Sequence, residues 1–317
     1  MQDWDISGSL TLRRFNVNAS FFCFSERLTD WPEALSLRAA ACDEAANRKT
    51  TLPEKLAFPR LVMLDLDGTL LGGDGAPYAR IPAPMCEFLD GLVGRGCDWA
   101  INTAWDIRGQ WELVLSSPVR SRPSFLVAEL GRCLARVVAD GPELVQPYTR
   151  TMNHSATDAA RKYMAPLLRE LCARHDFHKV NYYGHLLTFE AAGDPQAFQR
   201  DASARYAEAP GLHVAIDAGR LSASLACLHK GLGLAEVARL EGYAPCEVVV
   251  AGDEVADIAM MNGDCASHAI CPSNAHAAVK AHAERMGGVV ASQPNAKGVI
   301  EGFATLAERY GWTAPTA

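Results

Sequence analysis

The sequence predicts an α/β protein with a doubly wound, Rossmann-like parallel sheet as its core and an inserted α+β cap domain. Three observations support this prediction. A short apolar run, Leu61–Leu64, ends in the acidic pair Asp65 and Asp67. Strand-like and helix-like segments then alternate, which is typical of parallel sheets with right-handed crossovers. The stretch between Thr103 and Lys230 has a different pattern and is longer than one crossover needs.

The first strand is expected at Leu61–Leu64, because four consecutive apolar residues bounded by turn signals indicate a buried strand. Strand alternation places Asp65 and Asp67 on one side and Leu66 on the other. Gly68-Thr69 then permits a tight turn with free backbone N–H groups. Two carboxylates beside such a turn suit a hard cation together with a phosphate.

An amphipathic helix and two further strands are expected next. The helix is predicted by apolar residues at i, i+3, i+4, i+7 and i+8, namely Met85, Phe88, Leu89, Leu92 and Val93. It leads back to a strand, Trp99–Asn102, that ends at Thr103, and Phe125–Ala128 forms another strand. Ligands of such sheets bind at the carboxyl ends of the strands, so Thr103 is expected near Asp65.

The C-terminal part of the chain returns to the same alternation. Lys230 opens a helix in a glycine-rich context, and a Val-rich strand, Glu247–Ala251, leads to Gly252-Asp253. A helix near Val255–Met261 and a strand at His268–Cys271 follow. Because Asp253 ends a buried strand, its carboxylate is expected to line the same crevice as Asp65.

The inserted stretch predicts a separate α+β unit with an antiparallel sheet. A helix is expected at Ser155–His175. Strands are expected at His178–Tyr183, His185–Glu190, Leu212–Ile216 and Leu221–Ala226, with hairpin turns at Gly184 and Asp217–Gly219. The predicted domains are therefore a core of residues 58–132 and 227–317 and a cap of residues 133–226. Residues 1–57 form an N-terminal extension of unknown role, with a loosely helical pattern at Glu33–Arg48.

Composition limits the class of protein. A chain of 317 residues with 49% hydrophobic residues suits two globular domains. The net charge of −7 argues against a nucleic-acid partner, and the absence of an apolar run of about 18 residues argues against a membrane span. The ten cysteines are scattered without a CxxC pair and are expected to be reduced. Since Met1–Asp5 lacks the features of a signal peptide, a soluble, cytoplasmic protein is expected.

The segment Asp65–Thr69 resembles the DxDGT signature of the haloacid dehalogenase-like (HAD) superfamily, whose members are mostly phosphatases. The other family elements follow in order, as Thr103 after a strand, Lys230 at a helix start and the acidic loop Asp253–Asp257. The large insertion after Thr103 is similar to that of the Cof-like and sucrose-phosphatase-like branch. That branch acts mainly on phosphorylated sugars and other small phosphate esters.

The tail resembles the same branch, through Pro272–Lys280 and Lys297–Ile300. Three positions depart from the pattern of the branch. Ala104-Trp105 stands in place of Gly-Arg, Ala256 in place of Asn, and Leu130-Gly131 in place of Asn-Gly. These departures alter residues around the acids but leave the acids themselves intact.

The resemblance implies a role for each acid. Asp65 is the expected nucleophile, and Asp67 the expected general acid and base. Mg²⁺, which prefers octahedral oxygen coordination, is expected to bind Asp65, the carbonyl of Asp67 and Asp253. The hydroxyl of Thr103 and the ammonium of Lys230 are expected to stabilise the phosphate.

Further residues are expected to support the site or to select the substrate. Asp257 and Asn274 are expected behind the metal ligands, where Asp257 would orient Lys230 or a metal-bound water. The cap should choose the leaving group through polar side chains around the Gly184 turn. The candidates are Lys179, Asn181, Tyr183 and His185.

The expected function is a Mg²⁺-dependent phosphatase of a small phosphate ester, most of all a sugar phosphate, acting through an aspartyl-phosphate. Two alternatives stay open from the sequence. One is a mutase or phosphotransferase of the same fold, which uses the same aspartates under a cap that excludes water. The other is a catalytically silent protein that binds a phosphorylated metabolite.

Overall fold

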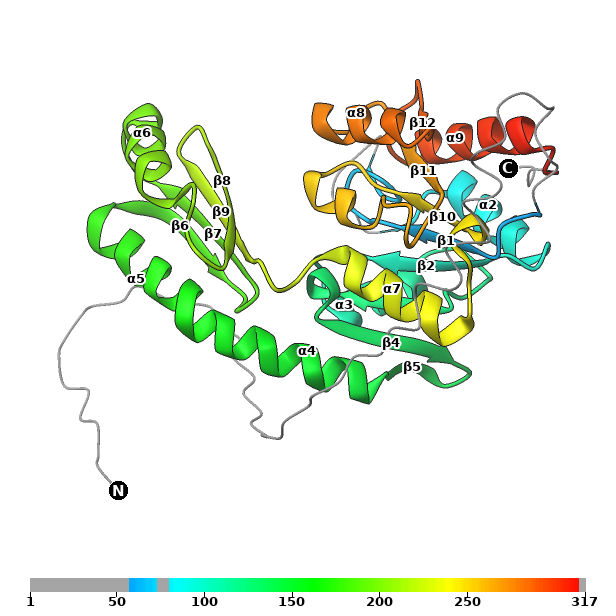
Figure 1. The fold of residues 1–317 in the computed structure, drawn as a ribbon, viewed down its shortest axis with the longest axis horizontal. Coiled ribbons are helices and arrows are strands. Elements are labelled where there is room, and N and C mark those ends of the chain that lie inside the picture. Colours follow the sequence, from blue (N-terminus) through cyan, green and yellow to red (C-terminus); the bar gives the residue numbers. More distant parts are fainter. Residues whose placement is uncertain (1–56, 73–79, 314–317) are drawn as a thin grey trace. The chain divides into compact units, whose positions relative to one another are not determined.

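A computed structural model describes residues 57–72 and 80–313 of the chain, and these residues form two sheets (Figure 1). The larger sheet has eight strands in the order β12-β11-β10-β1-β2-β3-β4-β5. Its strands are β1 (Leu61–Leu64), β2 (Asp98–Asn102), β3 (Phe125–Ala128), β4 (Cys133–Val138), β5 (Gly141–Leu144), β10 (Val248–Ala251), β11 (His268–Cys271) and β12 (Val289–Val290). Adjacent strands run parallel from β12 to β3, and β4 and β5 continue the sheet in antiparallel fashion.

Helices cover both faces of this sheet. They are α2 (Ala83–Val93), α3 (Ile107–Ser116), α7 (Lys230–Glu241), α8 (Ala277–Arg285) and α9 (Asn295–Tyr310). Short 3₁₀ turns, η1 (Glu129–Gly131), η3 (Pro245–Glu247) and η4 (Val255–Ala259), complete the connections. The predicted doubly wound α/β fold is therefore confirmed.

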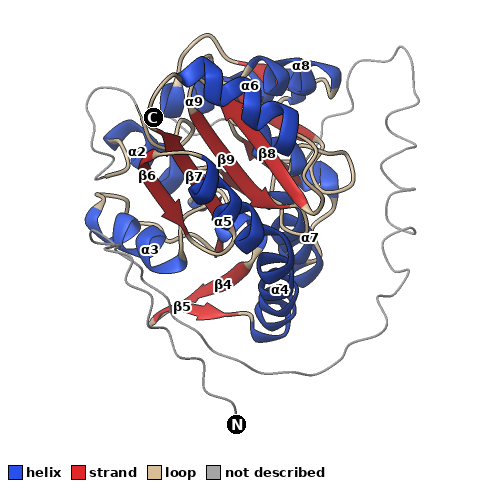
Figure 2. Cartoon of the chain, turned by 90° about the vertical axis from the view of Figure 1, so that its left-hand side faces the viewer, coloured by secondary structure: helices blue, strands red, loops and turns tan. Residues whose placement is uncertain are grey.

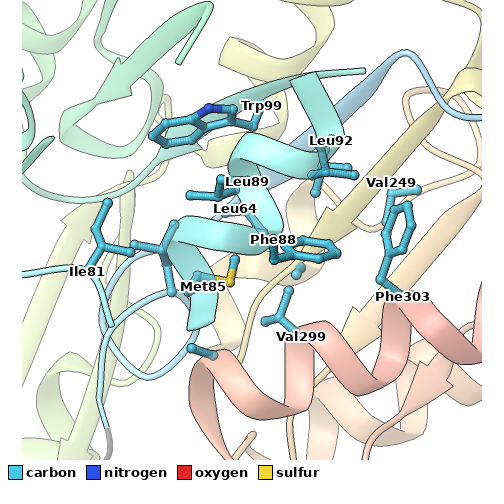
Figure 3. Packing of buried hydrophobic residues seen from close by; sticks show 14 of the residues in the cluster. Leu64, Ile81, Met85, Phe88, Leu89, Leu92, Trp99, Val249, Val299 and Phe303 are labelled. Atoms are coloured by element: carbon cyan, nitrogen blue, oxygen red, sulfur yellow. The ribbon is translucent and has the colours of Figure 1, made fainter. Parts of the chain in front are cut away.

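Strand alternation divides the core into two apolar layers. Val62 and Leu64 of β1 lie in a cluster with Phe88 of α2 and Phe303 of α9, whose rings meet edge to face at 5.2 Å (Figure 3). The intervening residues of β1 lie in the opposite cluster, with α7 and α8. Because β1 is buried on both faces, it reads in the sequence as an uninterrupted apolar run.

The smaller sheet belongs to the inserted region and is wholly antiparallel, in the order β6-β7-β9-β8. Its strands are β6 (Phe177–Tyr182), β7 (Leu186–Ala191), β8 (Leu212–Asp217) and β9 (Arg220–Leu225). Helices α5 (Ala165–Arg174) and α6 (Pro195–Tyr206) pack on one face through a third apolar cluster (Figure 2). The inserted α+β unit is present as predicted.

The expected start of this unit at residue 133 is wrong. Residues 133–144 form β4 and β5, and β4 pairs with β3 through Phe125–Ala128. They therefore extend the main sheet. They could not be separated from the insertion by sequence, because a short hairpin has the same sequence pattern whichever sheet it joins. At the other end, β9 finishes at Leu225 and α7 begins at Lys230, so the expected boundary near residue 227 falls between them.

The expected helix at Ser155–His175 begins earlier and is not uniform. It consists of α4 (Gln146–Ala159), a π-helical stretch η2 (Ala160–Met164) and α5. Ala165 N–H donates to the carbonyl of Ala160, five residues back. Pro166 lies just beyond this wider turn and has no N–H, so it cannot donate the usual helical hydrogen bond. The π-helical stretch accommodates this interruption of the helical bonding.

Smaller differences have local causes. The expected helix at Val255–Met261 is only the 3₁₀ turn η4, because Asp257 there is drawn into the site described below. Val93 at the end of α2 is 40% exposed, although its spacing fits the apolar stripe. Cys227 is exposed, although the apolar segments around it suggest a core residue. The helical pattern at Glu33–Arg48 and nearly all of the N-terminal extension lie outside the described residues.

Two expectations from composition can be compared with the described ranges. The eight cysteines within those ranges carry free thiols. None of the helices in the same ranges is both long and apolar enough to cross a membrane.

The first testable consequence concerns His268, the first residue of β11, which is 2% exposed. Burial lowers the pKa of His268 to about 4, and Arg309 acts in the same direction. Since the folded protein holds this imidazole neutral, stability is lost as the pH falls from the unfolded-state pKa near 6.5 towards 4. We expect wild type to lose about 3 kcal/mol more unfolding free energy than His268→Asn between pH 8 and pH 4.

Urea unfolding at several pH values measures this difference, because contributions from other groups cancel between the two proteins. His282→Asn is the matched control, since His282 is only half-buried. Parallel curves for wild type and His268→Asn would contradict the assignment.

Candidate active site

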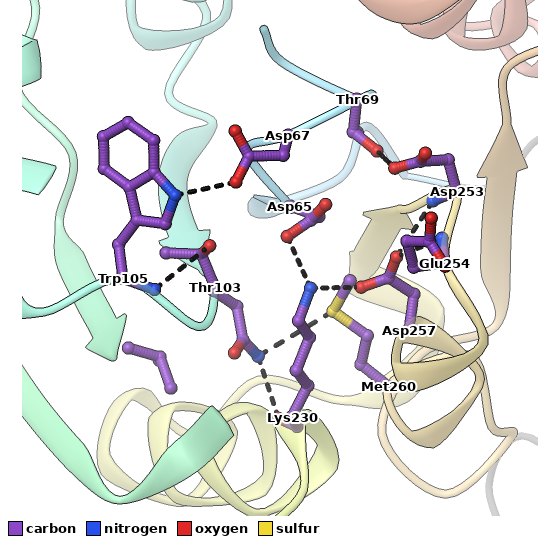
Figure 4. A network of polar contacts seen from close by, with 12 residues as sticks. Asp65, Asp67, Thr69, Thr103, Trp105, Lys230, Asp253, Glu254, Asp257 and Met260 are labelled. Atoms are coloured by element: carbon purple, nitrogen blue, oxygen red, sulfur yellow. Dashed lines mark hydrogen bonds and ion pairs between the residues drawn. The ribbon is translucent and has the colours of Figure 1, made fainter. Parts of the chain in front are cut away.

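The predicted catalytic and metal residues gather at the carboxyl edge of the main sheet (Figure 4). Asp65 and Asp67 follow β1, Thr103 follows β2, Asp253 follows β10, and Lys230 begins α7. The strands end level with one another because of their register. Leu64 at the end of β1 pairs with Ile101 on one side and Ala251 on the other.

The Lys230 ammonium lies between two buried carboxylates. Its Nζ is 2.5 Å from Asp65 Oδ1 and 2.5 Å from Asp257 Oδ1. All three residues are at most 4% exposed. A buried ammonium is costly to desolvate unless it is paired and hydrogen-bonded, and here two carboxylates provide both.

Asp257 organises the acidic loop. While Oδ1 accepts from Lys230, Oδ2 accepts the backbone N–H groups of Asp253 and Glu254, both at 2.9 Å. Gly252 leaves room for this turn, because a Cβ there would lie 2.3 Å from the Asp257 carboxyl carbon. With both oxygens engaged by protein donors, Asp257 orients Lys230 and the loop, as expected for a residue behind the metal ligands.

The side chain of Asp253 is held by residues from two other segments. Thr69 Oγ1 donates to its Oδ1 at 2.8 Å, and Asn274 Nδ2 lies 3.3 Å from its Oδ2. Asn274 also donates to the Gly68 carbonyl at 2.8 Å and accepts from the Asn295 N–H at 2.7 Å. Gly68 has φ +80°, and a Cβ on it would lie 2.2 Å from Asp253 Oδ2. Glycine is thus required where the loop after β1 meets the carboxylate of Asp253.

The buried charges do not balance. Asp65, Asp253 and Asp257 offer oxygens within 4.8 Å of one another, and among the described residues Lys230 is the cation paired with them. Burial and the charge of Asp257 raise the pKa of Asp65, against the opposing effect of Lys230. Burial likewise raises the pKa of Asp253 to about 6. For Lys230, burial acts to lower the pKa, but Asp257 and Asp65 outweigh it and the pKa lies above its ordinary value.

An oxygen-rich site with two uncompensated negative charges fits a hard divalent cation. Asp65 and Asp253 are the carboxylates that can hold it, because Asp257 is committed to Lys230 and to backbone donors. The third predicted ligand, Asp67, would contribute its carbonyl oxygen. This donor set suits Mg²⁺, which takes few carboxylates and retains several waters.

Thr103 and Asp67 occupy the other side of Asp65 (Figure 4). Thr103 is 2% exposed, and its Oγ1 accepts the Trp105 N–H at 3.5 Å, so its hydroxyl hydrogen is directed elsewhere. The carboxylate of Asp67 accepts the indole N–H of Trp105, with 2.7 Å between Nε1 and Oδ2. In the sequence, Trp105 stands out only as a departure from the pattern of the related branch.

Asn102 is a second residue that the sequence analysis missed. It is fully buried, and its Nδ2 donates to the carbonyl of Lys230 at 2.8 Å. This hydrogen bond connects the end of β2, which Thr103 follows, to Lys230, the first residue of α7. An amide directly after the apolar run Trp99–Ile101 was the available signal, because a buried polar side chain needs a partner.

The four predicted cap residues have different surroundings. Lys179 and Tyr183 are exposed. Asn181 donates to Thr188 Oγ1 at 2.9 Å across the β6–β7 pair, on the sheet face that α5 and α6 leave uncovered. His185 is 5% exposed, with Nδ1 3.2 Å from the Tyr183 carbonyl.

His185 also approaches the main-sheet segment after β3. Its Nδ1 is 3.5 Å from Glu129 Oε2, which in turn pairs with Arg132 at 2.8 Å. Burial lowers the pKa of His185, whereas Glu129 acts to raise it. Of the four candidates, His185 is the one whose side chain lies close to Glu129 of the core.

No protein-family model and no curated protein sequence matches this chain. Solved structures do match. Sucrose-phosphatase from Synechocystis sp. PCC6803, solved with sucrose and phosphate, is 13% identical and has a TM-score of 0.54, with 80% of this chain and 99% of that chain covered. TM0651 from Thermotoga maritima is 16% identical with a TM-score of 0.51, over 80% and 97% of the two chains.

A third similar structure is a phosphatase of the HAD superfamily. BT1666 from Bacteroides thetaiotaomicron, described among the phosphatases of the HAD superfamily, is 17% identical with a TM-score of 0.50, over 80% of this chain and 96% of that chain. The resemblance predicted from the sequence is confirmed in the fold: the chain has the fold of HAD phosphatases of the kind that includes sucrose-phosphatase. At such identities the likeness establishes the fold, and activity has to be argued from the site.

The charge imbalance predicts how Asp253 affects stability. A carboxylate whose folded-state pKa is raised destabilises the metal-free folded protein above that pKa. We therefore expect Asp253→Asn to raise the unfolding free energy of the metal-free protein by about 2 kcal/mol at pH 7.5. The gain should shrink below pH 6, where wild-type Asp253 becomes protonated.

The same variant should lose most of the stabilisation that Mg²⁺ gives to wild type, because binding to the folded state alone raises the melting temperature. Thermal unfolding in EDTA and in Mg²⁺ measures both effects. Asp264→Asn, which removes an exposed acid from a neighbouring loop, should change neither. An equal response of wild type and Asp253→Asn to Mg²⁺ would remove Asp253 from the metal site.

Proposed function

We propose that the protein is a Mg²⁺-dependent phosphatase that hydrolyses a small phosphorylated metabolite through an aspartyl-phosphate on Asp65. The favoured substrate class is a sugar phosphate. The observation that carries this proposal is the buried contact of Lys230 with Asp65 and Asp257, 2.5 Å on each side, next to the uncompensated Asp253. A phosphate monoester brings negative charge to its site, so it needs this ammonium and a cation together.

Each residue has a part in the proposed reaction. The Asp65 carboxylate attacks phosphorus in line with the leaving oxygen, and Asp67 donates the proton that the leaving alkoxide takes up. Asp67 then accepts a proton from the water that cleaves the aspartyl-phosphate. Thr103 and Lys230 stabilise the equatorial oxygens of the transferring group. Mg²⁺, held by Asp65, the carbonyl of Asp67 and Asp253, would supply further charge neutralisation.

Cap residues would select the substrate. The uncovered face of the small sheet carries a polar row across three strands, in which Asn181 pairs with Thr188 and Thr188 with Ser222. Hydroxyl and amide groups of this kind can hydrogen-bond the hydroxyls of a sugar. Lys179, Asn181, Tyr183 and His185 remain the proposed leaving-group contacts, since the Gly184 turn would bring them to the phosphate site when the cap closes.

A broad panel of phosphate esters, assayed with Mg²⁺ and with EDTA, tests the proposal. Turnover that EDTA abolishes supports a phosphatase. Transfer of phosphate to a second sugar, without release of inorganic phosphate, would favour the phosphotransferase. Binding of phosphate esters without turnover would favour a silent binding protein. If the protein neither hydrolyses nor binds any ester of the panel, all three functions are excluded.

The nucleophile gives the sharpest single prediction. Asp65→Asn keeps the size of the side chain but removes the attacking carboxylate, so kcat should fall at least tenfold, about 1.4 kcal/mol or more in barrier. Asp140→Asn, at an exposed position, should leave kcat unchanged. More than a tenth of wild-type kcat in a folded Asp65→Asn variant would exclude the covalent mechanism.

The cap prediction separates recognition from chemistry. Lys179→Ala and His185→Ala should raise KM for sugar phosphates and alter their ranking, yet hardly affect a small aryl phosphate that offers few cap contacts. Lys162→Ala, an exposed cation in the helical part of the insertion, is the control. Equal losses on sugar and aryl phosphates would mean that these side chains support folding or catalysis instead of specificity.

A further inference from the structure

Trp105 contacts the proposed general acid and base directly. Its indole Nε1–H donates to Asp67 Oδ2 at 2.7 Å, on the side of Asp65 away from Asp257 (Figure 4). The two residues come from different strand ends, since Asp67 follows β1 and Trp105 follows β2. A single mobile loop therefore does not set the contact.

The backbone of Trp105 is fixed on several sides. Its carbonyl accepts the N–H of Glu129 at 3.1 Å and the side-chain amide of Gln110 at 3.1 Å. Its own N–H donates to Thr103 Oγ1. The ring rests against the first turn of α3, where a Cβ on Gly109 would lie 3.6 Å from the Trp105 Cε3. The indole donor is thus held in place before any substrate binds.

The chemistry of an indole limits what this contact can do. Indole N–H is a donor only, so it neither takes a proton from Asp67 nor supplies one. It is also neutral, unlike the arginine that the related branch carries at this position. It can therefore direct the carboxylate without adding a charge to the balance between Lys230 and the acids of the site.

We infer that Trp105 is a positioning residue for Asp67: by occupying Oδ2, it sets the rotation of the carboxylate so that Oδ1 faces the leaving oxygen. This inference rests on the proposed phosphatase function. A general acid transfers its proton well only within hydrogen-bonding distance and in the right orientation. The loss of one orienting hydrogen bond should therefore weaken leaving-group protonation without removing the nucleophile.

The test compares two leaving groups by kcat/KM, which reports binding and the first phosphoryl transfer. An alkyl phosphate needs protonation of its leaving oxygen, whereas p-nitrophenyl phosphate releases a stable anion and does not. Trp105→Phe keeps a planar ring but removes the donor. It should lower kcat/KM for the alkyl ester about tenfold and leave the nitrophenyl ester within about twofold of wild type.

Two further variants make the result specific. In an Asp67→Ala background, Trp105→Phe should cause no additional loss on the alkyl ester, because residues that act as a unit are not additive. Trp111→Phe removes another half-buried indole on α3 and should leave both esters unchanged. Equal losses on both esters would make Trp105 a packing residue, and faster turnover of the alkyl ester would mean that it holds Asp67 away from the substrate. Unchanged kcat/KM for both esters would also overturn the inference.

A measurement without turnover tests the contact itself. The indole N–H resonance of Trp105, assigned by its loss in Trp105→Phe, should shift in Asp67→Ala and stay in place in Asp140→Ala. An unmoved resonance overturns the inference even if the protein is a phosphatase. If wild type hydrolyses neither ester while the resonance shifts, the proposed function has failed and the positioning role fails with it, although the contact exists.

Discussion

The burial of one ammonium between two carboxylates is the constraint on which the site depends. Lys230 is 3% exposed and holds Asp65 on one side and Asp257 on the other. Removing Lys230 would leave both carboxylates buried without a counter-charge, and breaking a buried ion pair in this way typically costs about 3–5 kcal/mol. The geometry around Asp65 is therefore set by electrostatics, and the proposed phosphoryl transfer would rely on preorganised charge of this kind.

The parallel sheet supplies the precision of this arrangement. β1, β2 and β10 end level, so three neighbouring strands present Asp65, Thr103 and Asp253 at one edge. Buried polar groups then connect the strand ends to their surroundings. Asn102 joins β2 to α7, and Thr69 joins the turn after β1 to Asp253. Because these bonds lie in an apolar setting, each is costly to leave unmade, and together they keep the site rigid.

Several features could be predicted from single residues and their spacing. The largely apolar runs of β1, β3 and β11 predicted the positions of these strands. Strands that are buried on both faces form continuous apolar runs, which stand out from the amphipathic pattern of the helices. The insertion was evident from its length. Its start was not, because β4 and β5 extend the main sheet by pairing with β3, and pairing partners are not encoded in a short strand. Val93 fits a helical stripe and is exposed, because what covers a helix end depends on its neighbours.

For the site, the sequence by itself determined which groups are present: two aspartates after one strand, a threonine after the next, a lysine at a helix start and an acidic loop. Local bonding rules and strand order suffice to place such groups at one edge. Only the tertiary structure decided their pairing. In the folded protein, Asp257 accepts hydrogen bonds from Lys230 and from backbone N–H groups, and Asp67 accepts one from Trp105. The fold also places His185 near Glu129. Apart from the bonds of Asp257 to the nearby backbone, these contacts join residues distant in the chain, and their geometry depends on how strands and helices pack.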